Sequence, residues 1–115
     1  MDLFSNIQTL LQQHPVFLFM KGTPERPFCG FSRTVVGILR LLNVSFGSYD
    51  ILQDDDMRQA IKEFSSWPTF PQLYINRELI GGCDITRDLY EQGELAKLLA
   101  PFQNKDLSKD LADQA

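Results

Sequence analysis

The chain has 115 residues, which is the length of a single ordinary domain. Its composition, with 43% hydrophobic and 23% charged residues, is typical of a globular protein and excludes disordered and collagen-like classes. The net charge is −4 and no cluster of Lys and Arg exceeds two residues, so we expect no nucleic-acid partner. No stretch approaches the roughly 18 apolar residues that a membrane span needs, so we expect no membrane partner.

The beginning of the chain and the cysteine content predict a cytoplasmic location. The first residues include Asp2 and lack the positive charges of a signal or transit peptide. The two cysteines, Cys29 and Cys83, are too few for a disulfide scaffold. In a reducing compartment, cysteines are more often chemical than structural.

The hydrophobic pattern predicts a mixed α/β arrangement. Short apolar runs predict strands, and apolar residues at helical spacing predict helices, the last of them broken at Gly93. A strand–helix–strand unit followed by a hairpin favours a mixed four-stranded sheet with helices on both faces. The predicted helices are 1–13, 29–42, 54–66 and 84–99, and the predicted strands are 16–20, 44–51, 72–76 and 78–80.

Four local features carry further expectations. The segment 22–27 contains one Gly and two Pro and is predicted to be a stiff loop. The turn at 76–77 lacks the Gly that a type I′ turn prefers at its second position. Asp84 is predicted to be the N-cap of the helix that follows the Gly81–Gly82 pair. The domain is expected to cover 1–102, with 103–115 as a flexible polar tail.

Cys29 is the first candidate for chemistry. It follows the proline-containing loop and begins a predicted helix, where free N–H groups and the helix dipole stabilise a thiolate. Lys21 lies at the end of the first predicted strand and can add positive charge near the sulfur. The alternative is a buried, inert cysteine. That alternative fits poorly with the neighbours Pro27, Phe28 and Gly30, which are typical of a surface loop.

The sequence around Cys29 resembles the monothiol glutaredoxins. Residues 21–32 read KGTPERPFCGFS and contain the family signature Cys-Gly-Phe-Ser, preceded by Lys-Gly-x-Pro and a long loop. Residues 67–71, WPTFP, match a second motif, and residues 81–84, GGCD, match a third. The three motifs occur in the order and spacing of the family, and the resemblance covers about residues 2–101. It implies a thioredoxin-like fold and a site for glutathione.

The resemblance assigns the glycine end of glutathione to two cations. Lys21 reaches its carboxylate from the end of a strand, and Arg58 matches a family position that binds the same end. Alone, a surface Arg58 is more often a solvated charge. In this fold Pro71 follows a cis peptide bond, which leaves the Phe70 backbone free to pair with the cysteinyl amide of glutathione. The alternative for Phe70 is a rigid turn with its side chain in the core.

The γ-glutamyl end is assigned to the start of the last predicted helix. Its N–H groups accept the carboxylate, and Asp84 accepts the ammonium. A plain N-cap is the alternative for Asp84, and the two roles can coexist. Cys83 is expected to line the site through its backbone; the alternatives are a small buried residue or a disulfide partner of Cys29. Trp67 and Pro68 are expected to shape the wall of the site or a partner surface.

Two functions remain open at this point. A [2Fe–2S] cluster needs four thiolates, and Cys29 from each of two chains plus two glutathiones would supply them in a homodimer. The resemblance implies such a carrier, working in iron–sulfur biogenesis and iron homeostasis, with a scaffold donor, recipient apoproteins and a heterodimer with BolA-like proteins. The alternative is glutathione-dependent thiol–disulfide exchange with Cys29 as the catalytic thiol. Ser32 stands where dithiol members have a second cysteine, which favours the carrier.

Overall fold

The computed structural model describes residues 2–104. From residue 105 onward the predicted tail lies outside the described residues. Among the described residues, no helix is long and apolar enough to cross a bilayer. The elements are α1 (Leu3–Gln13), β1 (Val16–Met20), β2 (Gly22–Thr23), β3 (Arg26–Pro27), α2 (Gly30–Leu41), β4 (Gly47–Asp50), the 3₁₀ turn η1 (Ile51–Gln53), α3 (Asp55–Ser65), β5 (Gln72–Ile75), β6 (Glu78–Gly81), α4 (Cys83–Glu91), α5 (Glu94–Leu99) and the 3₁₀ turn η2 (Ala100–Phe102).

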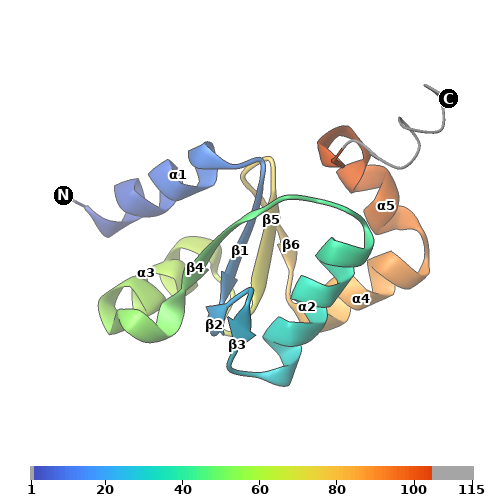
Figure 1. The fold of residues 1–115 in the computed structure, drawn as a ribbon. Coiled ribbons are helices and arrows are strands. Elements are labelled where there is room, and N and C mark those ends of the chain that lie inside the picture. Colours follow the sequence, from blue (N-terminus) through green and yellow to red (C-terminus); the bar gives the residue numbers. More distant parts are fainter. Residues whose placement is uncertain (1, 105–115) are drawn as a thin grey trace, which may run out of the picture.

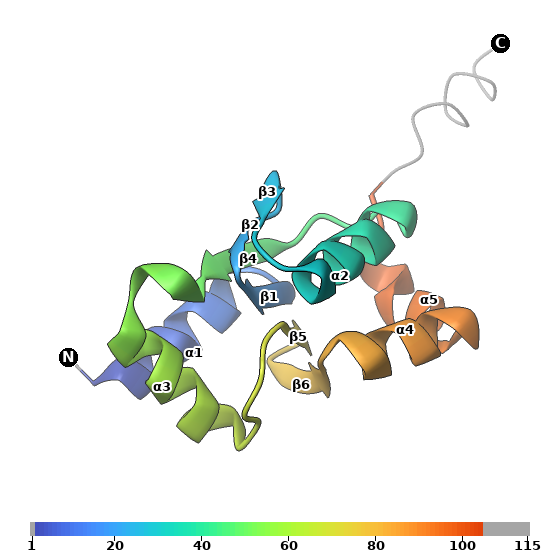
Figure 2. The same cartoon turned by 90° about the horizontal axis from the view of Figure 1, so that it is seen from below.

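The central sheet confirms the predicted architecture. Its strand order is β4-β1-β5-β6, with β4 parallel to β1 and the other neighbours antiparallel. Helices α1 and α3 cover one face, while α2, α4 and α5 cover the other (Figure 1). The view from below shows the same three layers (Figure 2). The predicted mixed four-stranded sheet with helices on both faces is therefore present.

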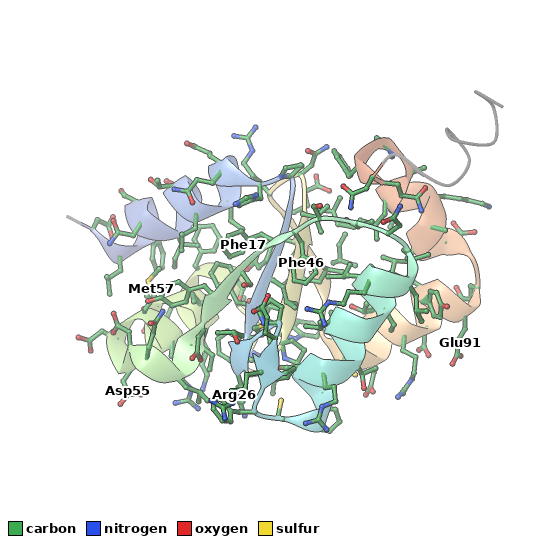
Figure 3. All side chains as sticks on the ribbon, in the orientation of Figure 1. Phe17, Arg26, Phe46, Asp55, Met57 and Glu91 are labelled. Carbon is green, nitrogen blue, oxygen red and sulfur yellow. The ribbon has the colours of Figure 1, made fainter. Side chains whose placement is uncertain are left out.

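Strand β1 is the centre of the core, and all five of its residues are buried. Because strand side chains alternate between faces, Val16, Leu18 and Met20 join the cluster under α2, α4 and α5. Phe17 and Phe19 join the cluster under α1 and α3. Figure 3 shows Phe17 on the α1 and α3 side of the sheet. Each fully buried side chain of this size contributes roughly 1.5–3 kcal/mol, so this strand fixes both helical layers.

The predicted loop over 22–27 is instead a short hairpin of β2 and β3. Gly22 has φ 88°, and a Cβ there would overlap the backbone carbonyl of Arg26 and approach the ring of Phe28. Its N–H donates to Asp50 Oδ1 at 2.9 Å, which ties the hairpin to the end of β4. The loop prediction was wrong because the pairing depends on this positive-φ glycine, which brings the strands together.

The predicted strand 44–51 is shorter than expected. Only Gly47–Asp50 pairs with β1, and Val44 forms an isolated bridge with Gln103. The strand ends because Asp50 Oδ1 accepts from the Leu52 N–H at 2.9 Å and starts the 3₁₀ turn. At the other end, Asn104 N–H donates to the Asn43 carbonyl at 2.8 Å.

The β5–β6 turn has positive φ at both central residues, 51° at Asn76 and 67° at Arg77. Type I′ turns require this combination, and they match the twist of the two strands. Arg77 adopts a left-handed conformation that costs an L-residue roughly 1–2 kcal/mol. The turn type is thus the one that the hairpin demands, despite the missing glycine.

Two glycines give a matched test of packing. A Cβ at Gly47 would overlap the His14 ring and lie 2.8 Å from Phe17, whereas a Cβ at Gly37 would have no neighbour within 4 Å. We expect Gly47→Ala to lower the free energy of unfolding by about 1–3 kcal/mol through overpacking. Gly37→Ala, inside α2, should raise it by about 0.5–1 kcal/mol. Urea unfolding measures both, and an equal loss in the two variants would contradict the packing of β4 against β1.

Candidate functional site

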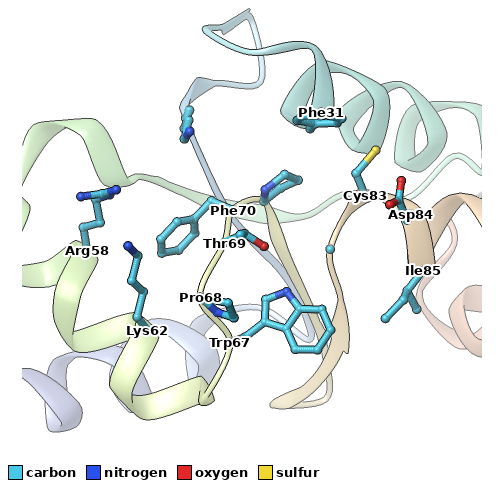
Figure 4. A pocket seen from close by; sticks show the side chains of 13 residues that line it. Phe31, Arg58, Lys62, Trp67, Pro68, Thr69, Phe70, Cys83, Asp84 and Ile85 are labelled. Carbon is cyan, nitrogen blue, oxygen red and sulfur yellow. The ribbon is translucent and has the colours of Figure 1, made fainter.

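A pocket of about 410 Å³ lies between α3, the α3–β5 loop and the start of α4. Its walls bring together five of the six residues predicted to form the site, although they come from distant parts of the chain. Cys29 is not part of the wall. Figure 4 shows the pocket with the loop beneath it and α2 above. The five predicted residues that line it are Lys21, Arg58, Phe70, Cys83 and Asp84.

The charges of the pocket are separated. Arg58 and Lys62 project from α3 on one side, while Asp84 lies on the opposite side at the start of α4 (Figure 4). Lys21, at the end of β1, adds a third cation to the wall. Lys62 was missed by the sequence analysis. Its spacing of four residues from Arg58 on a predicted helix was the available signal, since such residues share a face.

Cys29 is the N-cap of α2, as its predicted position at the start of a helix implies. Its sulfur accepts from the Ser32 N–H at 3.3 Å and lies 3.3 Å from Ser32 Oγ. Ser32 is fully buried, and its Oγ accepts from the Lys21 N–H at 3.2 Å. A Cys29 thiol can donate to this oxygen, whereas a Cys29 thiolate has no proton and can only accept from the Ser32 hydroxyl. The sequence analysis had read Ser32 only as a missing cysteine.

The pKa of the Cys29 thiol lies below its ordinary value. Partial burial acts to raise this pKa, but it is outweighed by the hydrogen bonds from Ser32 and by the positive charge of Lys21. These groups stabilise the thiolate more than the thiol. Cys29 is also only half-buried, so its sulfur combines thiolate character with access.

Cys83 has the opposite character. It is the first residue of α4 and is 8% exposed. Burial raises the pKa of its thiol, although the nearby Arg87 partly offsets this. Both cysteines are free thiols in the structure. Cys29 is therefore the more reactive of the two.

The N-cap of α4 lies two residues earlier than predicted. Gly82, not Asp84, is the N-cap, and no side chain caps the helix. The first-turn N–H groups are therefore free for an anion. Asp84 lies in the first turn, with Oδ1 3.1 Å from Arg87 Nη2. The N-cap prediction for Asp84 was wrong because the Gly81–Gly82 pair lets the chain enter the helix earlier, with the N-cap two residues before Asp84.

The α3–β5 loop presents a free stretch of backbone to the pocket. The Phe70–Pro71 peptide bond is cis, as the resemblance implied. The Phe70 side chain is 7% exposed and packs in the core between α1, α3 and the sheet. Among residues 2–104, no hydrogen bond uses the N–H or C=O of Phe70. An unpaired N–H and C=O at such a position can pair with the backbone of a peptide, as an added strand does.

The arrangement is suited to a short peptide with a carboxylate at one end and both charges of an amino acid at the other. Arg58 and Lys62 face one end, and free helix N–H groups and a carboxylate face the other (Figure 4). Lys21 adds a third cation to the wall, and the unpaired backbone of Phe70 lies between the two ends (Figure 4). Cys29, whose thiolate is stabilised by Ser32 and Lys21, lies beside the pocket and is not one of its lining residues.

The glutaredoxin family model matches residues 16–80 of the chain. Probable monothiol glutaredoxin 2 of Rickettsia typhi is 57% identical over 93 residues, which cover 81% of this chain and 84% of that protein. Monothiol glutaredoxin-S11 of Oryza sativa subsp. japonica is 61% identical over 89 residues, 77% of this chain but 18% of the rice protein. The chain thus spans about a fifth of the length of this relative and of monothiol glutaredoxin-S17 of Arabidopsis thaliana.

Solved structures agree with these relatives. Reduced apo GrxS14 of poplar matches with a TM-score of 0.78 and 52% identity, covering 86% of this chain and 91% of that one. A monomeric truncated mutant of Trypanosoma brucei 1-C-Grx1 matches with a TM-score of 0.80 and 35% identity, covering 93% and 99%. The fold is therefore thioredoxin-like. With the sequence relatives and the Cys-Gly-Phe-Ser motif at the start of α2, these matches show that the chain belongs to the monothiol branch of the glutaredoxin family.

Proposed function

We propose that the pocket binds glutathione. Lys21 and Arg58 would hold its glycine carboxylate, with Lys62 as a third cation at the same end. The backbone of Phe70 would pair with the cysteinyl amide. The free N–H groups at the start of α4 would accept the γ-glutamyl carboxylate, and Asp84 would accept its ammonium, displacing the exposed ion pair with Arg87. A buckwheat glutaredoxin has been solved as a glutathione complex, and its resemblance here, at 22% identity, is one of fold.

We further propose that the protein carries a [2Fe–2S] cluster as cargo. The observation that supports this most is the single accessible thiol of lowered pKa, with Ser32 in place of a second cysteine. Among the described residues, no group of three or more His, Cys, Asp or Glu side chains is arranged to hold a metal ion. The four thiolates that such a cluster needs would then be Cys29 from each of two chains and one glutathione sulfur at each.

This ligand set defines the partners of the carrier. A homodimer would hold the cluster between the two Cys29 sulfurs, and external glutathione ligands would make the cluster easy to release. An iron–sulfur scaffold would supply it and recipient apoproteins would take it, in iron–sulfur biogenesis and iron homeostasis. A BolA-like protein would replace one chain in a heterodimer. We place this activity in the cytoplasm.

Thiol–disulfide exchange is the second candidate, and the lowered pKa of Cys29 is the observation that favours it. The Cys29 thiolate would attack the glutathione sulfur of a protein mixed disulfide, forming a Cys29–glutathione disulfide and releasing the protein thiolate. A second glutathione thiolate would then attack that disulfide, restoring Cys29 and releasing glutathione disulfide. This cycle needs no second cysteine in the chain.

Anaerobic reconstitution distinguishes the two candidates. The chain is incubated with iron, a cysteine desulfurase as sulfide source and glutathione, and its visible absorption is recorded with its mass in solution. A charge-transfer band in a dimer that forms only with glutathione is the result expected of the carrier. A colourless monomer that turns over glutathione mixed disulfides as fast as a dithiol glutaredoxin would contradict the carrier and support exchange.

The two cysteines give a first prediction for the cluster. Cys29→Ser should abolish the charge-transfer band, because it removes the accessible thiolate ligand. Cys83→Ser should retain most of the band, since Cys83 is buried and its thiol pKa is raised. Visible absorption of both reconstituted variants measures this. Normal cluster absorbance in Cys29→Ser would contradict the ligand assignment.

The cationic end of the pocket gives a prediction for glutathione affinity. Lys21→Ala and Arg58→Ala should each weaken binding about tenfold, because each removes a charged donor to a carboxylate. Arg77→Ala, in the β5–β6 turn outside the pocket, removes the same kind of charge and should leave affinity unchanged. Isothermal titration calorimetry measures all three. Equal affinities in the wild type and both pocket variants would remove these residues from the site.

The hydrogen bonds to the Cys29 sulfur give a prediction for its reactivity. Ser32→Ala should raise the pKa of Cys29, because it deletes the hydroxyl that stabilises the thiolate. Alkylation at neutral pH should slow several-fold, and its pH midpoint should move upward. Ser48→Ala, an exposed serine on β4, is the control and should change neither. The rate of iodoacetamide labelling as a function of pH provides the measurement, and an unshifted midpoint would refute the role of Ser32.

A further inference from the structure

The α3–β5 loop that forms the floor of the pocket cannot hold its own shape by regular pairing. It runs through Pro68 and Pro71, which lack N–H donors, and forms no helix or strand. Its backbone must therefore be anchored by side chains from outside the loop. Ser65 provides one anchor, because its Oγ accepts from the Trp67 N–H at 3.1 Å.

Gln72 provides the anchor nearest to Phe70. Its backbone lies in β5 opposite Phe19 of β1, so it is fixed in the central sheet. Its side chain is fully buried and reaches back beneath the loop. Nε2 donates to the Trp67 carbonyl at 3.0 Å and to the Thr69 carbonyl at 3.2 Å. The Thr69 carbonyl belongs to the same peptide group as the Phe70 N–H, so the bond to Thr69 fixes the orientation of that N–H.

Tyr74 fixes the orientation of the Gln72 amide. Its hydroxyl donates to Gln72 Oε1 at 3.1 Å, and its side chain is 2% exposed. Burial raises the pKa of Tyr74 to about 12, with a smaller opposing effect from Ser65, so the hydroxyl stays a donor at physiological pH. Because Oε1 is occupied by this donor, Nε2 must face the two loop carbonyls. The amide therefore cannot rotate without losing all three hydrogen bonds.

We propose that Gln72 is a positioning residue for glutathione recognition, holding the Thr69–Phe70 backbone in register with the tripeptide from within the core. This inference rests on the proposed glutathione site. Gln72 is absent from the pocket wall, so it acts through the loop and not by contact with the ligand. A buried amide gains little stability over an apolar side chain of the same shape, because its hydrogen bonds are offset by desolvation. What the amide supplies and an apolar side chain cannot is a fixed loop position.

The test uses Gln72→Met, which keeps the unbranched shape but removes the donor, and Gln72→Leu as a second variant. Trp67 is the single tryptophan of the chain, so its fluorescence reports on this loop without a label. Leu73→Ala is the control for a general loss of stability. Leu73 is the next residue in β5, and it is buried in the core cluster under α2, α4 and α5, away from the α3–β5 loop bonds. Tyr74→Phe removes the bond to Oε1 but keeps the Nε2 donor for the two loop carbonyls, so it separates the orienting hydroxyl from the loop bonds themselves. For each variant, thermal unfolding, glutathione affinity by calorimetry and acrylamide quenching of Trp67 are measured.

We expect the Gln72 variants to weaken glutathione binding roughly tenfold and to increase Trp67 quenching at least about twofold. Leu73→Ala should change neither property, even with an equal or larger fall in Tm, and Tyr74→Phe should have a much smaller effect. Unchanged affinity and quenching in the Gln72 variants would overturn the proposal. The proposal would also be overturned if affinity and quenching changed in proportion to the fall in Tm across all variants. Gln72 would then act only through overall stability, as any core residue does.

The two readouts separate this proposal from the glutathione site itself. If the wild type binds no glutathione, the proposed function fails and Gln72 loses its role in recognition. Trp67 quenching then reports only whether Gln72 anchors the loop.

Discussion

The hydroxyl of Ser32 joins the two elements on which the chemistry of this protein depends. Its oxygen accepts from the Lys21 N–H directly after β1 and lies 3.3 Å from the Cys29 sulfur at the start of α2. Strand β1 is buried on both faces and therefore fixed in position. The contact through Ser32 holds the half-exposed Cys29 thiol in place relative to that strand. A reactive sulfur is thereby held at a helix N-terminus by a fully buried partner.

The rest of the site uses the same principle of support from the core. Gly22 allows the β2–β3 hairpin to form, and its N–H bonds to Asp50 at the end of β4. This bond fixes the position of Lys21, which lies between β1 and the hairpin. Gln72 supports the loop on the other side of the pocket. Lys21 directly follows β1, and the Phe70 backbone lies two residues before β5, so both adjoin the central sheet. Such support keeps a binding geometry fixed before the ligand arrives.

Much of the fold could be predicted from the sequence, because hydrophobic periodicity carries it. The wholly apolar run at 16–20 predicted a strand buried on both faces, and the structure confirms it. Contacts between distant residues could not be predicted. Ser32 bonds to a backbone N–H eleven residues away, and nothing local in the sequence indicates that partner. Asp84 was misread as an N-cap because glycine and aspartate both favour that position, and only the backbone decides between them.

The candidate site was predicted less from spacing than from the resemblance. Its three motifs placed Lys21, Phe70 and Cys83 in one region, and the fold brings them to one pocket. Lys62 was missed because it belongs to none of those motifs and, unlike Arg58, matched no other family position used in the prediction. Gln72 was missed because a polar residue in an apolar strand has no meaning until its partners are known.

The separation of charge in the pocket has a consequence for how a ligand approaches. The chain carries a net charge of −4, yet three cations line the pocket. A ligand with two carboxylates and one ammonium is therefore repelled at long range and attracted only at close range. Physiological salt screens interactions beyond about 8 Å, so it weakens the repulsion more than the contacts in the pocket. Encounter with such a ligand should consequently speed up, rather than slow down, as ionic strength first rises from low values.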